Sequence, residues 1–374
     1  MRSPRSLDAI IVEISSVSDR LDALAGEAEA RHTAPPELVD VMREIRVPMI
    51  KAPVEVGGDH LHLADQFGFF EALSYWNPTA AWTGFNHAGA CGIAGASLDD
   101  EGLEVLFGGD ASPFMAAVAA PTGTYERVDG GVRVRGRWKY ASGVPHSEWV
   151  LLSCLSAVGA GGPRIAVAST RDVVVTGEWD VMALQGTGSI DVVADGAFVP
   201  DHLSFAPGSA PRRGGPMFSL GYMGYVAPEN MGFTMGVCQR FMHEIVGYST
   251  KKARGLDGRL ADRGAFKYEL GRARLQVDAA RAFARSEFVE VDRGLLEGRP
   301  PARGVEQHLA SVVAFCTESA VQAVTRLFHF AGAGALFNSS VLQRCFRDAV
   351  GSSQHLMASN ASFDRKGEAL LAGA

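Results

Sequence analysis

The chain has 374 residues, of which 47% are hydrophobic and 21% are charged, and its formal net charge at pH 7 is −7. This composition is ordinary for a folded globular protein with room for two or three domains, and it excludes a disordered chain. The acidic balance argues against nucleic-acid binding, which needs clustered positive potential. Because no run approaches the roughly 20 apolar residues of a membrane-spanning helix, we expect no membrane segment.

The cysteines and histidines form no recognisable disulfide or metal pattern in the sequence. The five cysteines are far apart and odd in number, which fits a reducing cytoplasm. Apolar positions near the N-terminus are interrupted by Asp8, Glu13 and Asp19, so we expect no signal peptide. His60 and His62 lie two residues apart, but no carboxylate or cysteine completes a metal site beside them, and we expect no metal.

The first part of the chain has the residue spacing of amphipathic helices. Apolar residues recur three and four apart from Leu7 onward, and Pro35-Pro36 begins a second helical run. Helical spacing resumes at residues 61–76. Residues 80–98, AAWTGFNHAGACGIAGASL, are rich in alanine and glycine and contain His87. Small residues there allow close approach of another helix or of a ligand.

After residue 108 the spacing of apolar residues changes from about four to two. Asp129-Gly130-Gly131 lies between two alternating runs and predicts a hairpin with a glycine turn. Further strand-like runs lie at residues 149–155, 164–168, 173–179 and 189–193. They predict an antiparallel sheet domain that ends near residue 200. The segment 207–216, PGSAPRRGGP, is typical of a linker.

The last part of the chain predicts a helical bundle. Long amphipathic runs cover residues 229–248, 261–296, 305–331 and 341–360, and the first begins after Pro228. The fold class is therefore mainly α with a central β-domain. We expect an N-terminal helical domain at 1–110, a β-sandwich or barrel domain at 111–212 and a C-terminal helical bundle at 213–374.

Residues 342–357, LQRCFRDAVGSSQHLM, have the most distinctive pattern of this bundle. As one helix they place Arg344, Asp348 and His355 on roughly the same side. The apolar or small residues that share the opposite side are Leu342, Phe346, Ala349, Ser353 and Leu356. Gly351 and Ser352 beside His355 leave room for a planar ligand. On the pattern alone, an amphipathic helix with an Arg344–Asp348 pair and a histidine packed at an interface is the simpler interpretation.

Three stretches in this order resemble the acyl-CoA dehydrogenase superfamily and, within it, the oxygenase components of two-component flavin-dependent monooxygenases. They are GRWKYASG at 136–143, WDVMALQGTGSID at 179–191, and LFHFAGAGALF at 327–337 followed by the segment 342–357. The resemblance extends from about residue 36 to 359. It implies an acyl-CoA dehydrogenase-like fold with an N-terminal helical domain, an antiparallel β-domain and a C-terminal four-helix bundle.

The resemblance implies flavin contacts from Tyr140, Ser142 and Trp179. An isoalloxazine ring needs an aromatic or apolar wall and one or two hydrogen bonds from fixed groups near its reactive nitrogen, which these side chains can supply. Without the resemblance, the two aromatic residues are as readily sheet core, and Ser142 is part of a turn.

The resemblance also assigns residues at the far end of the flavin and at a subunit boundary. Arg254 takes the place of a family arginine suited to a phosphate, although the residues after it depart from the family pattern. Gly332 and Gly334 lie where the family's loop approaches the flavin of a neighbouring subunit, which implies an oligomer, usually a tetramer. Glycine permits close backbone approach, but it also simply breaks helices.

The choice between dehydrogenase and monooxygenase depends on the catalytic base. A dehydrogenase needs a carboxylate beside a thioester carbonyl, and none lies between Asp348 and Asp364. His355 stands there instead, as in the monooxygenase branch. The resemblance implies that His355 and Ser142 hold a C4a-hydroperoxyflavin or orient the substrate, and that His87 contributes from the first domain.

Glu229 leaves the dehydrogenase open as an alternative. It matches the position where some acyl-CoA dehydrogenases keep their base, but an acidic residue just after Pro228 is also favoured by the helix dipole. An N- or S-oxygenating enzyme of the same branch and a non-catalytic binding protein are further alternatives.

We therefore expect an oxygenase component that hydroxylates a small organic, aromatic substrate. Reduced FMN or FAD comes from a separate NAD(P)H-dependent reductase, because the chain has no recognisable nicotinamide site, and O2 is the co-substrate. The pocket must exclude water, and Phe85, Ala88 and Met235 are expected to line it.

Overall fold

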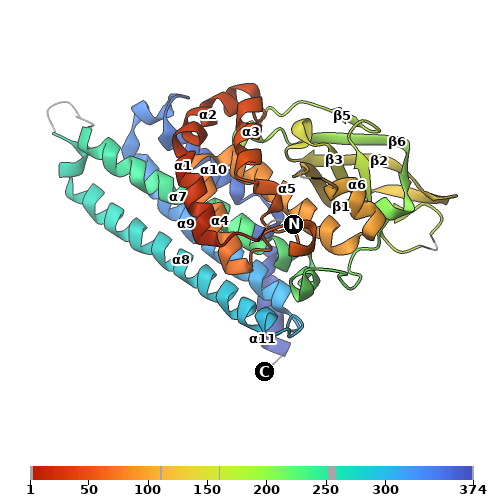
Figure 1. Ribbon diagram of the computed structural model, residues 1–374. Coiled ribbons are helices and arrows are strands. Elements are labelled where there is room, and N and C mark those ends of the chain that lie inside the picture. The colour runs from red at the N-terminus through yellow and green to blue at the C-terminus, as the bar shows by residue number, and fades with distance from the viewer. Residues whose placement is uncertain (1–2, 110–111, 160, 252–257, 373–374) are drawn as a thin grey trace. The chain divides into compact units, whose positions relative to one another are not determined.

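The computed structural model describes residues 3–109, 112–159, 161–251 and 258–372 (Figure 1). The contacts divide the chain into two compact units. The first unit comprises Met1–His62, Thr79–Val181 and Gln185–Ser219, and the second comprises Leu63–Pro78, Met182–Leu184 and Leu220–Ala374. The helix of residues 63–76 is thus grouped with the bundle helices. No described helix combines the length and the apolar character that crossing a membrane requires.

The helices of the first unit begin where the sequence supplies capping residues. They are α1 (Leu7–Ser16), α2 (Ser18–Arg31), α3 (Pro36–Glu44), α5 (Pro78–Ser97) and α6 (Asp100–Phe107). Ser6 Oγ accepts a hydrogen bond from Ala9 N, and Asp99 Oδ1 accepts one from Gly102 N, so both side chains satisfy amides of a first helical turn. Pro36 occupies the first turn of α3, where its missing N–H is not needed.

The strands of the first unit form one seven-stranded sheet in the order β5-β6-β2-β1-β3-β4-β7. They are β1 (Met115–Val128), β2 (Gly131–Ala141), β3 (Trp149–Ser156), β4 (Arg164–Ser169), β5 (Val174–Thr176), β6 (Ile190–Pro200) and β7 (Ser204–Phe205). The predicted hairpin is confirmed, since Val128 pairs with Gly131 across the Asp129-Gly130 turn.

One strand pairing differs from the prediction. The β1–β2, β2–β6, β3–β4, β4–β7 and β5–β6 pairs are antiparallel, whereas β1 and β3 run parallel. After β2 the chain returns past β1 and adds β3 at the other edge of β1, so β3 has the direction of β1. Turn residues indicate hairpins between consecutive strands, but they carry no signal for such a crossover.

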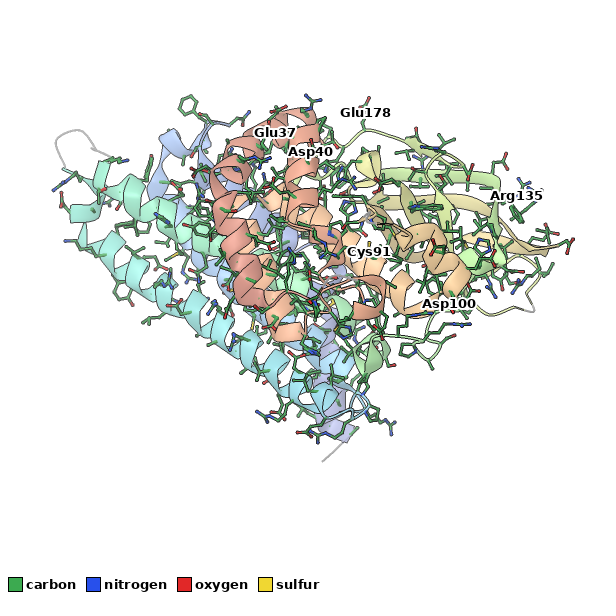
Figure 2. All side chains as sticks on the ribbon, viewed as in Figure 1. Glu37, Asp40, Cys91, Asp100, Arg135 and Glu178 are labelled. Carbon is green, nitrogen blue, oxygen red and sulfur yellow. The ribbon has the colours of Figure 1, made fainter. Side chains whose placement is uncertain are left out.

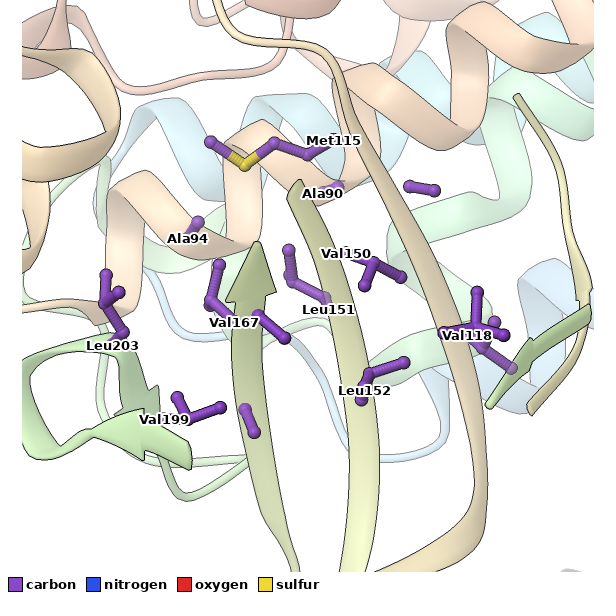
Figure 3. Close-up of a cluster of buried hydrophobic side chains, with 14 of the residues drawn as sticks. Ala90, Ala94, Met115, Val118, Val150, Leu151, Leu152, Val167, Val199 and Leu203 are labelled. Atoms are coloured by element: carbon purple, nitrogen blue, oxygen red, sulfur yellow. The ribbon is translucent and has the colours of Figure 1, made fainter. Parts of the chain in front are cut away.

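The core of the first unit lies between α5 and the sheet. Ala90 and Ala94 of α5 are fully buried near Met115, Val150 and Val167 of the strands (Figure 3). The small residues of α5 therefore let this helix lie close to the sheet. Figure 2 shows the contrast with the surface, where Asp100, Arg135 and Glu178 are exposed while Cys91 of α5 is buried.

The second unit is a helical bundle. Its helices are α4 (Leu63–Trp76), α7 (Gly221–Lys251), α8 (Gly264–Leu296), α9 (Val305–Ala331), α10 (Val341–Ser352) and α11 (Ala361–Ala372). Helices α4 and α7 pack closely at Gly236, where a larger residue would clash, because a Cβ there would lie 2.0 Å from Ser74 Oγ. Asp292 of α8 accepts hydrogen bonds from the amides of Leu63 (2.9 Å) and Ala64 (2.8 Å), and so caps the start of α4.

Two helix boundaries in the bundle correct the sequence analysis. Helix α7 begins at Gly221, so Pro228 lies inside it and Glu229 is fully buried in its interior. The helix-dipole explanation of Glu229 is therefore wrong. Helix α10 ends at Ser352, and His355 precedes the short 3-10 turn Leu356–Ala358, so the predicted helix through residue 360 is also wrong. Glycine and serine at 351–353 are weak helix formers, which explains the early end.

Candidate functional site

The turn at residues 140–146 follows β2 and carries two of the predicted site residues. Tyr140 has φ +65° and Gly143 has φ +76°, so the chain turns sharply, and Ser142 N donates to Tyr140 O at 3.0 Å. Tyr140 is 68% exposed, which excludes the sheet-core alternative for this residue. Its ring meets the ring of Trp179 edge-on, with centroids 6.3 Å apart. The structure thus brings Tyr140 and Trp179 together beside Ser142.

Ser142 begins a chain of three hydroxyl groups. Its Oγ lies 2.7 Å from Ser189 Oγ, which in turn lies 2.7 Å from Thr187 Oγ1. The Gly143 amide donates to Thr187 O at 3.0 Å and fixes the two segments to each other. The Gly-Thr-x-Ser sequence at 186–189 lies within the stretch 179–191 that resembles the family, but its Thr187 and Ser189 were not predicted as site residues. Their role as partners of Ser142 becomes visible only when the two stretches meet.

Helix α5 holds the turn from another side through consecutive residues. Asn86 Nδ2 donates to Ser142 O at 3.0 Å, and Asn86 Oδ1 accepts from Ala117 N at 2.9 Å. His87 packs against Gly143, where a Cβ would lie 2.6 Å from His87 Nε2, so only glycine fits at this position. His87 was predicted from the sequence, whereas Asn86, which has no distinguishing pattern there, was not.

His87 is fully buried and paired with a second histidine. His87 Nδ1 lies 2.9 Å from Met115 O, and its Nε2 lies 2.9 Å from His146 Nε2. Burial lowers the pKa of His87 to about 4, although the Met115 hydrogen bond opposes the shift. Burial, His87 and Arg43 together hold the pKa of His146 well below its ordinary value. Both rings are therefore neutral near pH 7. His146 was not predicted, since a lone histidine after a proline carries no sequence signal.

In the second unit, α10 contacts a short segment that follows Trp179 in the sequence. Asp348 is buried and its Oδ1 accepts from Leu184 N at 2.7 Å, while Arg347 Nη1 donates to Met182 O at 2.8 Å. A Cβ on Gly351 would lie 2.8 Å from Ala183 Cβ. The space expected at Gly351 for a planar ligand is thus filled by residues 183–184.

His355 is held by local hydrogen bonds after the end of α10. Its Nδ1 accepts from Met357 N at 3.3 Å, so the neutral ring carries its proton on Nε2. Burial lowers the pKa of His355 to about 4. Ser352 is buried, and its Oγ accepts from Thr234 Oγ1 at 2.9 Å. Leu356, expected on the apolar side, is 57% exposed because the 3-10 turn changes its direction.

The remaining predicted residues take different positions. Gly332 has φ +70° and ends α9, and Gly334 lies in the 3-10 turn Ala333–Leu336. Arg254 lies outside the described residues. Of the expected lining residues, Ala88 and Met235 are fully buried in their own units, and Phe85 is half-buried.

Asn230 of α7 is a polar residue that the sequence analysis overlooked beside Glu229. It is 1% exposed, and neither its Oδ1 nor its Nδ2 has a hydrogen-bond partner among the residues that the structure describes. A buried amide in this state costs free energy, so it is a place where a bound polar group would be stabilised.

Among the residues that the structure describes, no three His, Cys, Asp or Glu side chains gather as metal ligands. The cysteines are free and buried. Burial raises the pKa of the Cys154 and Cys316 thiols to about 12, which disfavours the reactive thiolate.

Known proteins resemble this chain along almost its whole length. A family model described as "Acyl-CoA dehydrogenase, C-terminal domain" matches residues 231–360. An indole-3-acetate monooxygenase of Pseudomonas putida is 24% identical over 358 residues, which cover 95% of this chain and 91% of that protein. The oxygenase subunit HsaA, a flavin-dependent monooxygenase of Rhodococcus jostii (strain RHA1), is 27% identical over 366 residues, covering 88% of this chain and 91% of HsaA.

The fold has a close match among solved structures. XiaF from Streptomyces sp., in complex with FADH2 and glycerol, superposes with a TM-score of 0.89 at 22% identity, covering 98% of this chain and 96% of XiaF. The predicted fold class is confirmed. The family model matches the C-terminal part of the chain, and the chain is similar along most of its length to proteins described as monooxygenases, among them the oxygenase subunit HsaA.

Proposed function

We propose that this chain is an oxygenase component that binds reduced flavin and uses O2 to hydroxylate a small aromatic substrate. The observation that carries the proposal is the turn at residues 140–146, where the exposed Tyr140 and the half-buried Trp179 lie beside a fixed hydroxyl. Tyr140 and Trp179 supply the wall that an isoalloxazine ring needs, and Ser142 supplies the hydrogen bond. The described residues therefore fit the flavin ring.

The proposed reaction balances without a metal. Reduced flavin supplies two electrons and two protons that activate O2. One oxygen atom replaces a substrate C–H bond by C–OH, the other leaves as water, and oxidised flavin is released. The chain's own residues bind, orient and exclude water.

Ser142 and His355 have separate proposed tasks. Ser142 is 7% exposed and its hydroxyl is anchored by Ser189, so it needs no reorganisation to hold a hydrogen bond to the flavin. His355 is neutral near pH 7 with its proton on Nε2, so it is proposed to donate a hydrogen bond to the reacting oxygen or the substrate rather than to act as a cationic acid.

The cofactor and the partners follow from the relatives by analogy. The structural neighbour XiaF was solved with FADH2, which supports reduced FAD ahead of reduced FMN for this chain. HsaA is described as an oxygenase subunit, which supports a separate NAD(P)H-dependent flavin reductase as the partner. We also propose a homotetramer, supported by Leu336 and Phe337, which are 69% and 68% exposed just after Gly332 and Gly334. The free cysteines support a cytoplasmic location.

A single-turnover experiment tests the proposal. The protein is mixed anaerobically with reduced FAD and, in a second sample, with reduced FMN, and each is then exposed to ¹⁸O2 with a panel of phenols and indoles. We expect tight binding of one reduced flavin and a hydroxylated product that carries one ¹⁸O atom. Flavin oxidation at the rate of free flavin, with only hydrogen peroxide formed, would show that the proposal is wrong.

A further inference from the structure

The histidine pair beside the 140–146 turn has a hydrogen-bonding direction that its neighbours impose. A backbone carbonyl can only accept, so His87 Nδ1 must donate to Met115 O over their 2.9 Å separation. The neutral His87 ring then has a lone pair on Nε2. His146 must therefore donate from its own Nε2 across the 2.9 Å contact.

This order of donors leaves an acceptor at the outer end of the pair. With its proton on Nε2, the neutral His146 ring has a lone pair on Nδ1. That Nδ1 atom is sealed from solvent, and it has no hydrogen-bond partner among the residues that the structure describes. An unsatisfied buried acceptor is unfavourable, and a hydrogen bond from a bound donor would remove that cost.

The acceptor lies on the same turn as the proposed flavin contact. Only Gly143, Val144 and Pro145 separate His146 from Ser142, and residues 144–146 form one 3-10 turn. His87 fills the space in which a Gly143 Cβ would lie, and the neighbouring Asn86 holds Ser142 O, so the imidazole pair and the hydroxyl are fixed to one support. Both groups are therefore held on one fixed segment of the chain, which favours binding of a ligand there.

We propose that His146 Nδ1 is a hydrogen-bond acceptor for a neutral O–H or N–H donor of a molecule bound at the 140–146 turn, and that His87 is the positioning residue that fixes its tautomer. The proposal rests on the proposed function. Two sources carry this donor chemistry, namely the reduced flavin and a phenol- or indole-type substrate.

The central test is a pair of substitutions that separates the two nitrogens of His146. His146→Gln places an amide donor near the Nε2 position, which keeps the bond to His87 but removes the Nδ1 acceptor. His146→Asn places an amide oxygen near the Nδ1 position and loses the bond to His87. A matched control in the same unit is His202→Gln, since His202 contacts Glu101 on α6 at 3.2 Å, away from the turn.

The measurements distinguish the two sources of the donor. The first is the Kd of reduced FAD under anaerobic conditions, and the second is the ratio of the substrate dissociation constants of a turned-over phenol and its methyl ether. We expect His146→Gln to change one of them by about two- to twelvefold, the effect of one hydrogen bond, with His146→Asn changing the same constant less. A weaker reduced FAD complex assigns the donor to the flavin, and a lost preference for the phenol assigns it to the substrate.

A spectroscopic measurement keeps the proposal testable if the variants fold poorly. In the wild-type protein, ¹⁵N NMR of the histidine rings should show protonated Nδ1 in His87 and protonated Nε2 in His146. Protonated Nδ1 in His146, or a His146→Gln protein that matches the wild type in both binding measurements, would overturn the inference. Absence of reduced-flavin binding and hydroxylation in the wild type would instead overturn the proposed function.

Discussion

The turn at 140–146 and the segment around His355 both carry predicted site residues, but they are held in different ways. Side chains of α5 and of the 186–189 segment contact the turn, through Asn86, His87 and Ser189 among others. His355 follows the end of α10, and its bonds to Ser352 O and Met357 N are local. The comparison indicates that segments distant in sequence fix the turn, so that it is preorganised.

The largest expected effect is that of substituting His355. His355→Ala removes a positioned hydrogen-bonding group, and we expect hydroxylation to fall about 100-fold or more while reduced flavin still binds. Product formation per turnover and the Kd of reduced FAD are the measurements. Gln354→Ala, at an exposed neighbour, is the control and should retain activity. Wild-type product formation in His355→Ala would show that His355 is structural.

Substitution of Gly143 in the turn should destabilise the protein. Gly143→Ala puts a Cβ 2.6 Å from His87 Nε2 at φ +76°, so both backbone strain and the histidine contacts oppose it. We expect a loss of about 2–5 kcal/mol in the free energy of unfolding. Gly130→Ala is matched, because Gly130 has φ +73° with nothing within 4 Å, and it should cost only about 1–2 kcal/mol. Equal losses in urea denaturation would show that His87 does not constrain the turn.

Both regions contain a histidine that should make stability depend on pH. The folded-state pKa of His87 and of His355 is about 4, below the ordinary 6.5. Between pH 4 and 6.5 the unfolded chain therefore binds more protons than the folded chain. The contribution of each neutral buried histidine to the free energy of unfolding is complete above pH 6.5 and is lost as the pH falls toward 4. The slope reaches about 1.4 kcal/mol per pH unit for each histidine. Urea denaturation should show a shallower slope in His355→Gln, and a slope identical to that of the wild type would contradict the account.

The smallest effect is expected outside both regions. Glu229 is buried inside α7, and the monooxygenase reaction proposed here gives it no proton to take. Glu229→Gln has nearly the same shape and should leave hydroxylation largely unchanged. A large loss of turnover with unchanged folding would instead revive the dehydrogenase alternative.

The periodic parts of the structure were predictable, and the contacts between distant segments were not. Helix α9 matches its predicted run because 3.6-residue spacing is local information. The parallel β1–β3 pair, the Ser142–Ser189 contact and the His87–His146 pair join residues far apart in sequence, which periodicity cannot reveal. Pro228 was misleading, since proline usually begins a helix but here lies inside α7.

The site residues that were predicted lie mainly in sequence motifs. Tyr140, Ser142 and Trp179 came from stretches that resemble a family, and the structure brings these three together. Asn86 and His146 complete the turn only through their geometry, so no pattern could single them out.

The central claim is that the fixed Ser142 hydroxyl holds the reduced flavin while oxygen is transferred. The most direct measurement is the hydrogen peroxide released per reduced flavin consumed, with substrate saturating, in Ser142→Ala and in the wild type. Loss of one hydrogen bond should raise the ratio of hydrogen peroxide to hydroxylated product by about two- to twelvefold. The control Ser15→Ala, whose hydroxyl bonds only within α1 to Ile11 O among the described contacts, should match the wild type. Wild-type coupling in Ser142→Ala would contradict the account.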